Sequence, residues 1–134
     1  MPATKKKEIA FKLKNIEILE TELRPPVSNQ PKPSVYNFNI TIEHRYNIDL
    51  KAIIVVVNIQ ILDDNKENTL GSVKTGCVFV LAEFDTFLNK EKTEVNLPED
   101  LIILFNSISI STSRGIMFAY FRGTHLHNAV LPII

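Results

Sequence analysis

A long alternation of apolar and polar residues constrains this chain more than any other feature. Even positions from 36 to 50 carry apolar side chains or His44, and odd positions from 37 to 49 carry polar ones. From position 53 to position 61 the apolar residues continue on odd positions. A period of two is typical of a β-strand that buries one face. We therefore expect an extended chain from position 34 to position 62.

This stretch is too long to remain a single strand. Its 29 residues would reach about 95 Å at roughly 3.3 Å per residue, whereas a globule of this length has a radius of gyration near ~14 Å. The polar segment 46–51 contains Asn47 and Asp49, which tolerate turn geometry. The sequence predicts two long antiparallel strands joined by a tight hairpin.

A first strand is predicted near the N-terminus, where the parity of the apolar residues changes between Leu13 and Ile16. A bulge near Lys14 and Asn15 explains the change, because it inserts one residue into a strand. Four prolines then make 24–33 an extended crossover loop. Such a connection fits a Greek-key arrangement.

A fourth strand is predicted over residues 70–84, after the polar turn 63–69. Cys77, Phe79 and Leu81 point to one face of this strand, and the apolar residues between them point to the other. The charged segment 85–96 is expected to be irregular.

Residues 97–122 are predicted to form a long helix. Pro98, Glu99 and Asp100 are typical of a first helical turn. Serine and isoleucine alternate from position 107 to 113, however, and Gly115 costs a helix about 1 kcal/mol relative to alanine. Two short strands therefore remain an alternative. The tail is expected to pack as a loop, through the following side chains: Leu126, Val130, Leu131, Ile133 and Ile134.

Length and charge limit the classes of function. The 134 residues are expected to form one domain, 1–134, with a frayed tail over 1–7. The net charge is zero, which favours neither nucleic-acid binding nor a membrane surface. No apolar run near ~18 residues predicts a membrane span. The single cysteine, Cys77, is expected to be a buried thiol in a reduced compartment, and a cytoplasmic location follows.

No residue pattern predicts catalysis, a cofactor or a metal. His125 and His127 form an H-x-H pair, but no nearby cysteine or acidic cluster completes a site. His44 lies in an apolar row, which indicates a hydrogen-bonded core histidine. Catalytic and phosphate-binding motifs are absent from the sequence, so an enzyme is not expected.

The two central strands are apolar on both faces over 53–57 and 77–82, and such a sheet needs two covering layers. One helix can cover only one face. We therefore expect a second copy of the chain to cover the other face, with Val78 in the contact. The tail and the proline-rich loop are the alternative cover. The apolar cluster 116–121 is either a subunit contact or a groove for a foreign chain.

Two stretches carry a resemblance to a known family. The strand Val-Lys-Thr-Gly-Cys-Val-Phe-Val-Leu-Ala from Val73, followed by a long helix, Arg122-Gly-Thr and a closing Leu-Pro, resembles SecB, the bacterial protein-export chaperone, and its SecB-like relatives. The resemblance covers about residues 34–134. It implies an α+β fold, with a four-stranded antiparallel Greek-key sheet and a long C-terminal helix packed on one face.

The resemblance also implies a function. Members hold unfolded or pre-secretory polypeptides in apolar grooves without ATP, as dimers or dimers of dimers. The implied groove positions are Phe79, Phe118, Phe121 and Leu126, and Val73 and Thr75 are implied to lie near subunit contacts. This chain is neutral and stops at Ile134, without the second helix and acidic tail that engage the translocase motor. An oligomeric adaptor, or a chaperone dedicated to one antitoxin, is the alternative.

Overall fold

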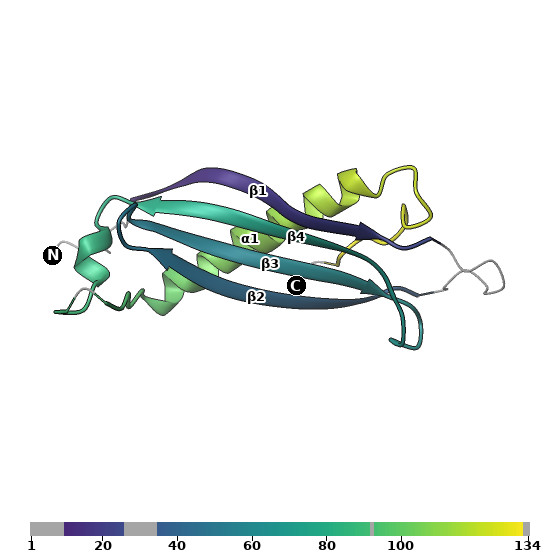
Figure 1. Ribbon diagram of the computed structural model, residues 1–134, viewed down its shortest axis with the longest axis horizontal. Coiled ribbons are helices and arrows are strands. Elements are labelled where there is room, and N and C mark those ends of the chain that lie inside the picture. Colours follow the sequence, from purple (N-terminus) through teal and green to yellow (C-terminus); the bar gives the residue numbers. More distant parts are fainter. Residues whose placement is uncertain (1–9, 26–34, 92, 133–134) are drawn as a thin grey trace, which may run out of the picture.

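The predicted strands form a single antiparallel sheet in the computed structural model, which describes residues 10–25, 35–91 and 93–132. The strands are as follows: β1 (Phe11–Leu23), β2 (Asn37–Asn47), β3 (Ala52–Leu62) and β4 (Thr69–Leu81). Their order across the sheet is β1-β4-β3-β2, so that the first strand lies beside the last, as in a Greek key. The helix α1 (Glu99–Tyr120) packs on one face (Figure 1). The predicted fold class is confirmed.

The central hairpin is also confirmed. β2 and β3 pair without a register shift, from Asn37 opposite Leu62 to Asn47 opposite Ala52. Residues 48–51 make the turn, in which the Leu50 backbone N–H donates to Asn47 Oδ1 at 3.1 Å. The asparagine side chain thus stabilises the reversal of the chain, as its turn propensity suggests.

β1 contains two irregularities, of which the sequence predicted one. The pairing with β4 shifts between Leu13 and Asn15, as expected, and shifts again between Ile18 and Glu20. Because of the second shift, Leu19 has no directly paired residue in β4, and the alternation of side chains between the two faces is interrupted there. Leu19 then lies over Gly76, at 3.4 Å from where a Cβ atom on that glycine would be. It therefore points to the face of the sheet that is turned away from α1, called here the outer face.

β4 ends at Leu81, three residues earlier than predicted. Leu81 pairs with Phe11, the first residue of β1, so the sheet offers no further partner strand beyond this point. The chain continues as a 3₁₀ turn, η1 (Phe84–Phe87), whose Phe84 is buried. A bridge between Leu88 and Val95 orders part of the segment that was predicted to be irregular.

Residues 99–120 form one continuous helix, and the alternative of two strands is wrong. Five side chains of α1 are buried against the sheet: Leu101, Phe105, Ser109, Ser113 and Met117. Ser109 and Ser113 lie about one turn apart on the same side of α1. These two of the four alternating serines contact the sheet, and their small side chains let the helix approach it closely. α1 is long and apolar enough to cross a membrane, with a mean hydropathy of 1.4. Here, one face of it packs in the core of the domain.

The tail that follows α1 turns back on the helix side of the sheet (Figure 1). Leu126 and Leu131 are buried, as predicted, but Val130 is 51% exposed and Ala129 is buried in its place. The last two isoleucines lie outside the described residues, as do positions 1–7 and most of the proline-rich loop. Because the tail joins α1 on the same side, it does not cover the outer face, and cover of that face by the tail is wrong. Cover by the proline-rich loop stays a prediction, because most of that loop lies outside the described residues.

Candidate polypeptide-binding surface

The four predicted groove residues occupy different environments. Phe79 is completely buried under α1, and its ring stacks on that of Phe105 with a centroid distance of 4.2 Å. Phe121 and Leu126 are also buried, each 1% exposed. Phe118 is different, because 48% of it is exposed near the end of α1. In this conformation only Phe118 of the four presents an apolar surface to another molecule.

The three predicted interface residues lie on opposite faces of β4. Val73 and Thr75 face α1 and are completely buried, and the Thr75 and Ser113 hydroxyl oxygens lie 2.5 Å apart. Val78 is on the outer face, between Asn15 of β1 and Ile54 of β3, and is partly buried. A second copy that covered the outer face would therefore reach Val78 directly, while Val73 and Thr75 belong to the core of the chain.

Large apolar side chains remain exposed on β1 and α1. α1 crosses the sheet obliquely (Figure 1). Ile16 and Ile18 of β1 belong to the row that faces the helix side, yet they are 43% and 55% exposed. Ile103 and Leu104 of α1 are 55% and 42% exposed. The sequence did not indicate this surface, because an alternating strand pattern does not reveal which part of a strand the helix will leave uncovered.

β1 is also an edge strand, which pairs only with β4 among the described strands. Its other edge presents backbone N–H and C=O groups that can pair with another chain. Charge is unevenly distributed along this strand. Lys12 and Lys14 lie in its first half, whereas Glu17, Glu20 and Glu22 lie in its second half.

The histidines take structural roles. His44 is half-buried, and its Nε2 atom lies 2.7 Å from Asn106 Oδ1 on α1, so the prediction of a hydrogen-bonded histidine is confirmed. His125 Nε2 lies 2.7 Å from the carbonyl oxygen of Arg24, whereas His127 lies beside the ring of Phe118. The His125 contact joins the tail to the residue after β1, and the His127 contact joins it to α1. Among the described residues, no group of three histidine, cysteine or acidic side chains could hold a metal ion.

The single cysteine lies at the centre of the core. Burial raises the pKa of the Cys77 thiol, and the neighbouring Ser109 hydroxyl opposes part of that rise. The Ser109 oxygen has no well-formed hydrogen bond within the described part of the chain. A completely buried thiol with a raised pKa is a poor nucleophile, which is consistent with a packing role.

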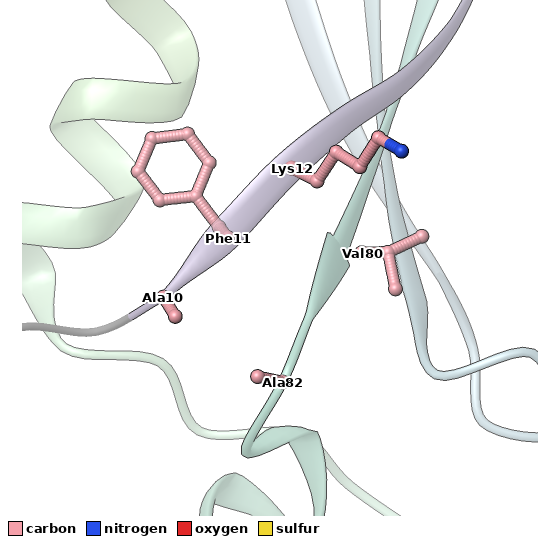
Figure 2. A pocket seen from close by; sticks show the side chains of 5 residues that line it. All are labelled: Ala10, Phe11, Lys12, Val80 and Ala82. Carbon is pink, nitrogen blue, oxygen red and sulfur yellow. The ribbon is translucent and has the colours of Figure 1, made fainter.

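A shallow depression of about 260 Å³ lies where β1 begins and β4 ends. Figure 2 shows its lining, with Phe11 directed toward α1 and with Lys12 and Val80 on the other side of the strands. Lys12 is its one charged side chain. The site offers neither converging polar groups nor depth, so it does not resemble a small-molecule site.

Comparisons with known proteins place this fold. No protein-family model matches the sequence, and no curated protein matches it significantly. Among solved structures, the chain is similar to the SecB-like chaperone Rv1957 of Mycobacterium tuberculosis, solved in complex with a ChAD peptide from the HigA1 antitoxin Rv1956. The TM-score is 0.60 and the identity 14%, over 92% of this chain and 87% of the other. The resemblance to SecB-like chaperones is thus confirmed at the level of the fold.

Proposed function

We propose that this protein is a cytoplasmic, SecB-like holding chaperone that binds non-native polypeptide segments without ATP. The observation that carries the proposal is the fold, which is shared with a SecB-like chaperone over nearly the whole chain. The exposed apolar side chains of β1 and α1 support it, because a surface of this kind binds unfolded segments through burial rather than through side-chain detail.

A dedicated partner is the second candidate. The similar solved chaperone holds a peptide of one antitoxin. In this reading the same apolar surface would bind one particular partner segment, and competition between that segment and general clients would separate the two functions.

We further propose that the chain forms homo-oligomers through the β1 edge. Antiparallel pairing of two β1 strands about a two-fold axis would bring Lys12 and Lys14 of one copy close to Glu20 and Glu22 of the other. The same pairing would cover part of Ile16 and Ile18. Light scattering that finds a monomer at micromolar concentration would rule this assembly out.

The function is tested by the aggregation of a chemically unfolded protein in the presence of stoichiometric amounts of this chain. We expect the wild type to suppress aggregation and the variants Phe118→Ser and Ile103→Ser, at exposed positions of α1, to lose most of this activity. Leu50→Ser is the matched control, because Leu50 is 65% exposed in the β2–β3 turn. Unchanged aggregation with the folded wild type would refute a general holding activity. Binding to a single partner from an otherwise inactive protein would support the dedicated role.

A further inference from the structure

The segment 129–132, called here the strap, lies beside α1 in neither helix nor strand. Ala129 is 3% and Leu131 1% exposed, whereas Val130 between them is 51% exposed. An alternation of buried and exposed side chains is typical of an extended segment lying on an apolar surface. The strap therefore has the pattern of a bound peptide, although it belongs to the same chain.

Arg114 of α1 holds the backbone of the strap. Its Nε atom donates to the carbonyl oxygen of Leu131 at 3.0 Å, and its Nη2 atom donates to the carbonyl oxygen of Pro132 at 3.1 Å. The guanidinium group presents several N–H donors in a fixed planar arrangement, which here meets two successive carbonyl groups. A contact of this kind recognises an extended backbone regardless of its side chains.

The buried side chains of the strap are part of the hydrophobic core. Ala129 and Leu131 belong to one buried cluster that also contains Ile59 and Ile61 of β3, and side chains of β2 pack against this cluster. The backbone N–H groups of Ala129 and Val130 donate within the tail, to the carbonyls of Leu126 and Asn128. The strap is thus attached to the domain mainly through two side chains and Arg114, not through a ladder of backbone hydrogen bonds.

We propose that the strap occupies a groove that also receives client segments, and that clients displace it. The groove takes an extended polypeptide with apolar side chains two positions apart, as at Ala129 and Leu131. Arg114 is its positioning residue and binds the client carbonyls in the same way. The inference rests on the proposed chaperone function, and it adds competition between client and strap to that function.

Competition has a measurable consequence. When the binding-competent state is only a fraction of the population, the apparent affinity falls by that fraction, and a variant that weakens the strap restores it. We therefore expect Leu131→Ala to bind a fluorescent peptide copying residues 126–132 about tenfold more tightly than the wild type does. The control is Val130→Ala, which changes an exposed side chain of the same segment and should bind the peptide like the wild type.

The role of Arg114 is tested in the released background. Adding Arg114→Lys to Leu131→Ala keeps the positive charge but removes the planar donor arrangement. We expect this double variant to remain folded and to lose most of the gain in peptide affinity. An undiminished gain would show that Arg114 does not position the bound segment.

Hydrogen exchange on the wild type provides a test that needs no variant. A saturating amount of a chemically unfolded client should speed the exchange of amides in 126–132, while those of β3 stay protected. If the client binds and these amides stay protected, the strap is a permanent part of the core and the inference is wrong. If neither client nor peptide binds to the wild type or to folded Leu131→Ala, the proposed function and the groove both fail.

Discussion

The two faces of the sheet are buried in different ways. On the helix side, Val57 and its neighbours on β3 and β4 are completely buried beneath α1 and the tail. On the outer face, no described element covers the strands, yet Val56 is only 2% and Ala52 only 3% exposed. The comparison shows that part of the outer face is buried within one chain.

The outer face is covered partly by its own strands. The second irregularity of β1 directs Leu19 over Gly76, and Ile54 approaches the same glycine from β3. Small residues in the middle of β4 allow these neighbours to close over the centre of the face. The expected cover by a second copy stays a prediction, but part of the burial that motivated it is achieved within one chain.

The largest loss of stability is expected from Phe105→Ala, which removes a ring from the core on the helix side. Phe105 is 1% exposed, stacks on Phe79 and makes an edge contact with Phe11 at 5.1 Å. Its loss leaves a cavity under α1, and the free energy of unfolding should fall by about 3–5 kcal/mol. Urea unfolding measures this change. Leu104→Ala, at a position that is 42% exposed, is the control and should cost less than about 1 kcal/mol. Equal losses would mean that the helix side is not the main core.

Substitution of two glycines in β4, one on each face, allows the packing of the two faces to be compared directly. A Cβ atom on Gly71 would lie 2.7 Å from Leu126 Cδ1 and 3.0 Å from the Glu22 carbonyl oxygen. A Cβ atom on Gly76, on the outer face, would meet only Leu19 at 3.4 Å and Ile54 at 3.7 Å. We expect Gly71→Ala to destabilise the fold by about 1–3 kcal/mol and Gly76→Ala by less than about 0.5 kcal/mol. Thermal unfolding measures both, and a reversed order would contradict the assignment of the faces.

The smallest effects are expected at Ser109 and Ser113, the two buried serines of α1. Ser113→Ala removes the hydrogen bond to Thr75 and leaves that buried hydroxyl with one partner fewer, which should cost about 1–2 kcal/mol. Ser109→Ala removes a buried hydroxyl that has no well-formed hydrogen bond in the described chain, so stability should change by less than about 0.5 kcal/mol or rise. Chemical denaturation of the two variants side by side decides this. A larger loss for Ser109→Ala would indicate a partner such as an ordered water.

Much of the fold could be predicted from local patterns. The period of two over 34–62 indicated both strands of the central hairpin, and Asn47 and Asp49 indicated its turn. The parity change before Ile16 indicated the first bulge. The second was missed, although Glu17 and Glu20, which pair with Gly76 and Lys74 on the outer face, have opposite parity in the sequence. The alternation of serine and isoleucine was ambiguous, because a helix can also place Ser109 and Ser113 on one side.

The binding surface was less predictable. Phe79, Phe118 and Phe121 look alike in the sequence, but only the second is exposed, because exposure depends on where α1 lies across the sheet. For a similar reason Val130, which was expected to pack on the domain, is exposed, and Ala129 is buried in its place. The position of the strap depends on its hydrogen bonds with Arg114 and on burial of Ala129 and Leu131 in a core whose other members are distant in the sequence.

The sequence by itself determined the elements of this protein, their order and the sides on which their apolar residues lie, because periodicity and turn chemistry act over a few neighbouring residues. Tertiary structure alone decided which apolar side chains were buried, which stayed exposed on β1 and α1, and where the tail packs. Those outcomes depend on the packing of segments up to a hundred residues apart, and a local pattern carries no record of it.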